Sequence, residues 1–205
     1  ASIDRVTNKI RPIPSGAVED RLYSEVGAAF FFASILLSAI VFPKGALLLF
    51  LYQSIAWSYS APPFRLKRFP VVATSVSALA SLLVLFIGYM SISRDQTLEG
   101  LPASLLWLFF FSYAIALPLK DFKDIEGDRR DGVWTLPVLL GVQRSKLLIG
   151  TGIFLSFLTS VSVFRSQALF LPALLFGGAS FWAIIAMKEK TGRITYRSVF
   201  GWMLA

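Results

Sequence analysis

The sequence predicts an all-α protein, a multi-pass bundle of transmembrane helices, and three observations lead to this fold class. Hydrophobic residues make up 56% of the 205 residues, and the mean hydropathy is +0.68. Soluble domains are usually about 45–50% apolar. Apolar runs of about 20 residues, the length that crosses a bilayer, recur along the chain. Lys and Arg are distributed very unevenly between the loops that join these runs.

The apolar runs predict six membrane spans and the beginning of a seventh. We place them at residues 22–42, 44–60, 70–93, 100–119, 145–164, 167–187 and from Ser198 onward. Residues 1–20 form a polar lead-in without the pattern of a targeting peptide. We therefore expect residues 1–205 to form a single membrane-embedded domain that is truncated at both ends.

The loop charges predict the orientation of these spans. Of the 20 Lys and Arg residues, 17 fall on one side of the predicted membrane, and the other side carries Lys44, Arg94 and Arg165. An excess of Lys and Arg in short loops marks the cytoplasmic side. The net charge of +8 is thus explained by contact with membrane lipids, and we expect no nucleic-acid partner.

Cysteine and histidine are both absent from the sequence. Their absence excludes a disulfide framework, a thiolate nucleophile, a His-ligated zinc site and imidazole acid–base chemistry. Any metal chemistry must therefore use oxygen ligands.

The most unusual segment is acidic and follows the fourth span, with the sequence KDFKDIEGDRRDGVWTLPVLLG from Lys120 to Gly141. If the helix continues, Asp121, Asp124 and Asp128 share one face, with Lys123 on the opposite face. Carboxylates one turn apart at a helix C-terminus repel each other and oppose the helix dipole. A cation such as Mg²⁺, bound jointly by carboxylates and substrate phosphates, would offset this repulsion. The alternative is a solvated juxtamembrane loop of mixed charge.

Two other loops on the same side have unusual chemistry. Asp4, Asn8 and Arg11 share a helical face until Pro12 ends it, and a Pro-stiffened loop then presents Arg11. This arginine either binds a phosphate or belongs to an ordinary positively charged loop.

The second loop follows Tyr59, with the sequence YSAPPFRLKR. Its Pro-Pro pair forces an extended backbone, and the cations after it, including Lys67 and Arg68, suit either lipid headgroups or a diphosphate. After the acidic segment, the apolar residues 133–140 predict a short interfacial lid that Gly141 caps.

Three segments together resemble the UbiA superfamily of intramembrane prenyltransferases: DRVTNKIRPIPSG (Asp4–Gly16), YSAPPFRLKR (Tyr59–Arg68) and the acidic segment. The resemblance implies a fold of nine spans around a cavity that opens sideways to lipid. It also implies Mg²⁺-dependent transfer of a prenyl group from a polyprenyl diphosphate to a small-molecule acceptor, which is aromatic, a chlorin or a lipid.

The resemblance also assigns roles to residues of this sequence. It implies metal ligands at Asp4, Asp124 and Asp128, with Asp121 joining Asp124 and Asp128 as catalytic residues. It implies diphosphate contacts from Arg11, Lys67, Arg68 and Lys120, and substrate contacts from Asn8 and Tyr59. The first motif of the superfamily, NDxxDxxxD, is represented only by its last aspartate, Asp4.

Two other classes of function compete with the enzyme. A catalytically silent membrane subunit that packs in a larger complex would account for the incomplete first motif, although the sequence identifies no protein partner. A transporter is disfavoured, because the predicted spans carry almost no ionisable residue at mid-depth, where an ion pathway normally needs one.

Overall fold

The computed structural model describes residues 16–130, 132–187, 199 and 201–202, and every regular element in this part of the chain is a helix. Six long helices form the body of the fold, namely α2 (Asp20–Val41), α3 (Pro43–Ser60), α4 (Pro70–Ile92), α5 (Ala103–Ala116), α8 (Val142–Val163) and α9 (Phe170–Ala186). Short helices join them, namely η1 (Leu66–Arg68), η2 (Leu117–Lys123), α6 (Ile125–Arg130), α7 (Leu136–Leu140) and η3 (Gln167–Leu169).

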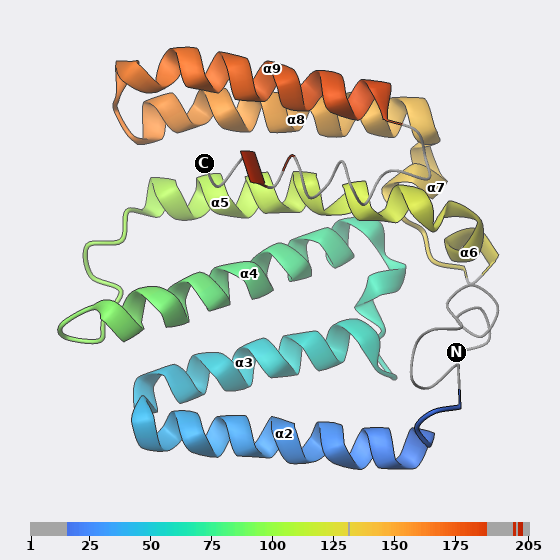
Figure 1. The fold of residues 1–205 in the computed structure, drawn as a ribbon, viewed down its shortest axis with the longest axis vertical. Coiled ribbons are helices and arrows are strands. Elements are labelled where there is room, and N and C mark those ends of the chain that lie inside the picture. Colours follow the sequence, from blue (N-terminus) through green and yellow to red (C-terminus); the bar gives the residue numbers. More distant parts are fainter. Residues whose placement is uncertain (1–15, 131, 188–198, 200, 203–205) are drawn as a thin grey trace.

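The long helices lie side by side and alternate in direction, as Figure 1 shows. Each packs against its neighbour in the chain, and α5 packs directly against α8 because α6 and α7 lie at the end of the bundle. The α3–α4 connection, η2, α6 and α7 therefore gather at one end. This arrangement brings together two of the three loops that the sequence analysis identified.

The predicted helices are confirmed with small shifts at their ends. Pro43 and Pro70 begin α3 and α4. A proline fits at the first helical position because the N–H it lacks would have no partner there. Gly141 separates α7 from α8 with a φ of +78°, in agreement with its expected capping role. The segment predicted to begin at Ser198 falls largely outside the described residues, although Val199, Gly201 and Trp202 are helical.

Five segments of the described chain are long and apolar enough to cross a membrane, namely Arg21–Val41, Pro70–Ile92, Ala103–Lys123, Val142–Val163 and Gln167–Ala186. The helix predicted at 44–60 forms as α3 but is not among them. Polar residues such as Lys44 and Gln53 lower the mean hydropathy of this helix. The Gln53 amide nitrogen donates a hydrogen bond to Ser34 Oγ on α2 at 2.7 Å, so part of this polarity is satisfied within the bundle.

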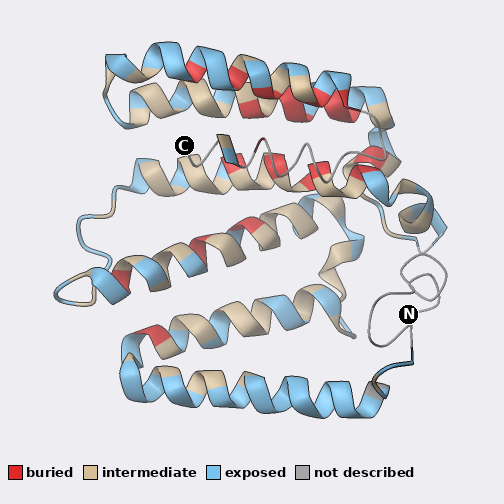
Figure 2. Cartoon of the chain, viewed as in Figure 1, coloured by how far each residue is buried: buried red, intermediate tan, exposed pale blue. Residues whose placement is uncertain are grey.

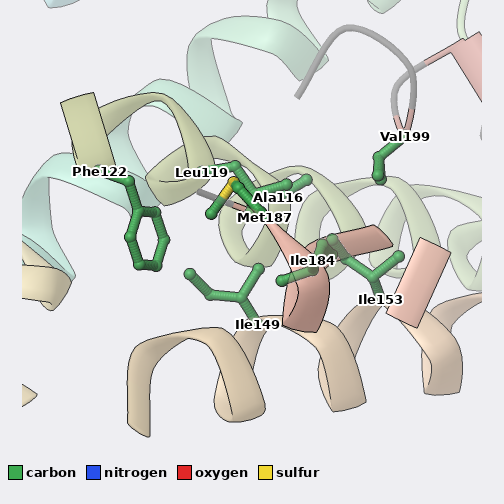
Figure 3. Close-up of a cluster of buried hydrophobic side chains, with 8 residues drawn as sticks. All are labelled: Ala116, Leu119, Phe122, Ile149, Ile153, Ile184, Met187 and Val199. Atoms are coloured by element: carbon green, nitrogen blue, oxygen red, sulfur yellow. The ribbon is translucent and has the colours of Figure 1, made fainter. Parts of the chain in front are cut away.

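Burial is concentrated where α5, α8 and α9 meet, whereas α2 is exposed along nearly its whole length (Figure 2). One cluster of buried side chains occupies this junction, comprising Ala116, Leu119, Phe122, Ile149, Ile153, Ile184, Met187 and Val199 (Figure 3). Leu119 and Phe122 belong to η2, next to the acidic residues. The apolar side of η2 is therefore packed against α8 and α9.

A buried lysine adds a polar link at the same junction. Lys146 near the start of α8 is only 6% exposed, and its ammonium donates hydrogen bonds to the backbone carbonyls of Ile185 and Met187 at the end of α9. Carbonyls in the last turn of a helix have no partner within the helix. Lys146 thus satisfies them and fixes the end of α9 against α8.

Candidate active site

The acidic segment does not continue α5 as a regular α-helix, so the condition under which the three aspartates would share one α-helical face is not met. Pro118 lies in the first turn of η2, where the helix narrows to the 3₁₀ form. A proline inside an α-helix removes one backbone hydrogen bond and clashes with the preceding turn, which explains the change of helix type. Asp121 lies in η2, Asp124 ends it, and Asp128 lies in α6.

The three aspartates nevertheless follow one another by single turns. The Asp124 N–H donates to the Asp121 carbonyl at 3.0 Å, and the Asp128 N–H donates to the Asp124 carbonyl at 2.8 Å. All three residues line one pocket. Lys123 was expected on the opposite face, but its ammonium lies 3.2 Å from Asp124 Oδ2 in a largely exposed ion pair. Asp124 directly follows Lys123 in the chain, so the long lysine side chain reaches it while Lys123 itself does not line the pocket.

The pocket is a cavity of about 160 Å³ at the end of the bundle where the loops gather, and we call it the acidic pocket. Tyr59 from the end of α3, Lys67 from η1 and Lys120 from η2 line it with Asp121, Asp124 and Asp128. Its walls thus combine two ammonium groups, three carboxylates and a phenol.

Two backbone hydrogen bonds hold the segments of the acidic pocket together. The Trp134 N–H donates to the Arg68 carbonyl at 3.2 Å, and the Val133 N–H donates to the Asp128 carbonyl at 2.8 Å. Residues 133–135 therefore lie between the loop that carries Lys67 and the segment that carries Asp128. The folded backbone, and not only charge attraction, determines the distances across the pocket.

The structure places the expected site residues in three groups. Tyr59, Lys67, Lys120 and the three aspartates come together in the acidic pocket. Arg68 is exposed and does not line the pocket, although its backbone carbonyl anchors Trp134. Asp4, Asn8 and Arg11 lie outside the described residues.

The apolar segment after α6 also contributes to the pocket. Val133, Thr135 and Leu136 line it, and only α7, the last part of this segment, is helical. The sequence predicts an apolar lid at residues 133–140 but does not single out Thr135 as a site residue. The one available signal was a hydroxyl residue within an otherwise apolar run.

A second cavity of about 300 Å³ adjoins the acidic pocket and shares Tyr59, Ser77 and Leu117 with it. Its other walls come from α3 and α4 and are mostly apolar, including Ile55, Ala80 and Val84. We call it the apolar cavity. The two together place a charged pocket beside an apolar one.

The acidic pocket matches Mg²⁺ in the chemistry of its donors. Mg²⁺ prefers hard oxygen ligands and usually binds one or two protein carboxylates together with substrate phosphates. Within the described ranges, however, no three acidic side chains are grouped closely enough to hold a metal ion by themselves. The described aspartates can therefore supply part of a metal site, and the remaining expected metal ligand, Asp4, lies outside those ranges.

Comparisons with known proteins point to one family. The profile of the UbiA prenyltransferase family matches residues 1–204. Digeranylgeranylglyceryl phosphate synthase from Haloquadratum walsbyi is 30% identical over 75% of this chain and 52% of its own length. The bacteriochlorophyll synthase 33 kDa chain from Cereibacter sphaeroides is 32% identical over 68% of this chain and 46% of its own length. The chain thus spans about half the length of these relatives.

A solved structure that concerns digeranylgeranylglyceryl phosphate synthase in membranes has the same fold. It covers 99% of this chain and 73% of its own, with a TM-score of 0.64 and 16% identity. At that identity the similarity concerns the arrangement of helices.

Proposed function

The chain belongs to the UbiA prenyltransferase family, and on that premise we propose that it transfers a prenyl group from a polyprenyl diphosphate to a small-molecule acceptor. Its apolar helices make it an integral membrane protein. The observation that carries the proposal is that the acidic pocket lies next to the apolar cavity and shares Tyr59, Ser77 and Leu117 with it. A prenyl diphosphate has the same division into a charged head and an apolar tail.

The charged residues have separate roles in this proposal. Lys67 and Lys120 bind diphosphate oxygens, because ammonium groups form strong charge-assisted hydrogen bonds with phosphate. Asp124 and Asp128, with Asp121 one turn earlier and Asp4 from the first motif, would hold Mg²⁺. When bound there, the metal would supply positive charge to stabilise the leaving diphosphate.

The apolar cavity keeps water away from the reacting carbon. In the transfer, the bond between the prenyl carbon and the diphosphate oxygen breaks, and the electron pair leaves with the diphosphate. A nucleophilic atom of the acceptor then forms a bond to that carbon and gives its proton to a carboxylate of the acidic pocket or to the leaving diphosphate. Residues that line the apolar cavity, such as Ile55 and Val84, hold the prenyl chain and exclude water that would otherwise compete with the acceptor.

We propose an aromatic, chlorin or lipid acceptor. The names of the relatives include a glyceryl phosphate synthase and a bacteriochlorophyll synthase, which makes the last two classes the first to test. We also propose that the end of the bundle with the acidic pocket faces the cytoplasm, because the described loops there are richer in Lys and Arg than the described loops at the other end.

The test is binding of geranylgeranyl diphosphate to the full-length protein in detergent, with Mg²⁺ and with a chelator. We expect Mg²⁺ to strengthen binding, and Asp124→Asn with Asp128→Asn to weaken it by at least about tenfold. Asp95→Asn, in the loop that follows the opposite end of α4, is the control and leaves binding unchanged. Transfer of the prenyl group to candidate acceptors is then measured with the same variants.

The proposal is contradicted if the affinity for geranylgeranyl diphosphate changes neither when Mg²⁺ is removed nor when both aspartates are substituted. The protein would then be better described as a family-derived subunit without catalysis, and a search for a protein partner would follow.

A further inference from the structure

Thr135 has one polar atom for which the fold provides no partner. Its backbone N–H donates to the Val133 carbonyl at 3.2 Å, and its carbonyl accepts from the Leu139 N–H at 3.0 Å. Its side-chain Oγ1 is buried and makes no hydrogen bond. Buried polar atoms are nearly always hydrogen-bonded, so each exception calls for a physical reason.

The usual role of a threonine at this position does not supply that reason. Thr135 is the residue that caps the start of α7, where a threonine oxygen commonly accepts a hydrogen bond from an N–H of the first turn. No such side-chain bond forms here. The hydroxyl therefore does not stabilise α7 in the ordinary way.

The location of Thr135 distinguishes it from other unsatisfied groups. Four buried side-chain atoms in the described part of the chain have no hydrogen-bond partner, namely Gln53 Oε1, Arg65 Nε, Thr135 Oγ1 and Ser180 Oγ. Of these four residues, only Thr135 lines the acidic pocket.

The backbone around Thr135 is held in place on both sides of the pocket. Trp134, directly before it, is bonded to Arg68, the neighbour of Lys67. Val133 is bonded to Asp128. Thr135 is thus fixed between a cationic loop and the acidic segment, which is the arrangement expected of a residue that orients a ligand.

We propose that Thr135 contacts the ligand and that its hydroxyl donates a hydrogen bond to a phosphate oxygen of the diphosphate. The inference rests on the proposed function and adds a residue to that site. Lys67 and Lys120 line the pocket beside the three aspartates, and the Mg²⁺ that the proposed function assigns to these aspartates would offset their charge toward an anion. Phosphate oxygens are strong hydrogen-bond acceptors. A bound diphosphate would give the Thr135 hydroxyl the partner that the folded chain does not.

The test compares Thr135→Val, which keeps the shape and removes the hydroxyl, with Thr135→Ser, which keeps the hydroxyl. Binding to the full-length protein is measured with three probes, namely geranylgeranyl diphosphate, inorganic diphosphate and geranylgeraniol. Thermal unfolding of each variant in the same detergent reports on folding. We expect the valine variant to bind geranylgeranyl diphosphate about tenfold more weakly, and the serine variant to stay within about threefold of the wild type.

The three probes distinguish the outcomes. A tenfold loss for both diphosphates with no change for geranylgeraniol supports a phosphate contact. If the valine variant loses affinity for geranylgeraniol equally, the phosphate contact is overturned and Thr135 has a structural role. The same conclusion follows if the serine variant binds geranylgeranyl diphosphate as weakly as the valine variant. Valine-variant binding equal to the wild type also overturns it, while the proposed function stands. If the wild type itself fails to bind geranylgeranyl diphosphate, the proposed function fails.

Discussion

The backbone N–H of Trp134 donates a hydrogen bond to the backbone carbonyl of Arg68 across 3.2 Å. This bond joins the connection between α3 and α4 to the segment that follows α6. It uses the main chain of Arg68, whose side chain is exposed, while the adjacent Lys67 lines the acidic pocket. Two neighbouring cations that look equivalent in the sequence therefore have different roles in the fold.

The first prediction separates these two cations. Lys67→Gln should weaken binding of geranylgeranyl diphosphate by about tenfold, because it removes a charge-assisted contact in the acidic pocket. Arg68→Gln is the control and should change the affinity less than about twofold. Titration calorimetry in detergent measures both. Equal losses for the two variants would indicate a diffuse positive potential rather than a specific contact.

The second prediction concerns the apolar cavity. Ala80 lines this cavity on α4, and Ala80→Phe would fill part of its volume. Affinity for geranylgeranyl diphosphate should fall about tenfold or more, while affinity for the much shorter dimethylallyl diphosphate should stay the same.

The matched control is Leu79→Phe, one residue earlier on α4, where the side chain is 42% exposed. Leu79→Phe should change the affinity for neither geranylgeranyl diphosphate nor dimethylallyl diphosphate. If Ala80→Phe weakens both diphosphates equally, the apolar cavity does not hold the prenyl chain.

The third prediction tests the packing of α5 on α8. A Cβ at Gly152 on α8 would lie 2.6 Å from Ile115 Cδ1 and 2.8 Å from Ile115 Cγ2. Gly152→Ala should therefore lower the free energy of unfolding by about 1–3 kcal/mol through overpacking. Unfolding of the purified protein in mixed micelles provides the measurement.

Gly178→Ala on α9 is the control, because a Cβ there meets nothing within 4 Å. Its effect on the free energy of unfolding should be within about 1 kcal/mol. Equal destabilisation by the two alanines would mean that the contact between Gly152 and Ile115 is not what limits the approach of α5 and α8.

The helices were predictable because their boundaries are chemically distinct. Pro70 begins α4, as its predicted span does, and Gly141 allows the positive φ between α7 and α8. The 3₁₀ geometry of η2 was not predicted, since the sequence shows that Pro118 disrupts a helix but not which alternative the chain adopts.

The site was predictable to the extent that local spacing determines it. The turn-by-turn spacing of Asp121, Asp124 and Asp128 follows from short-range hydrogen bonds. The different roles of Lys67 and Arg68, and the unpaired hydroxyl of Thr135, depend on contacts between segments far apart in the chain. No pattern within a short stretch of sequence indicates such contacts.

The described lining of the acidic pocket comes from residues between Tyr59 and Leu136, whereas the buried cluster behind η2 also uses α8 and α9. During synthesis the lining residues therefore leave the ribosome before the helices that support Leu119 and Phe122. A nascent chain that has reached only α7 has these residues but lacks the packing that fixes η2. The geometry of the pocket is completed only after the later helices have entered the membrane and docked.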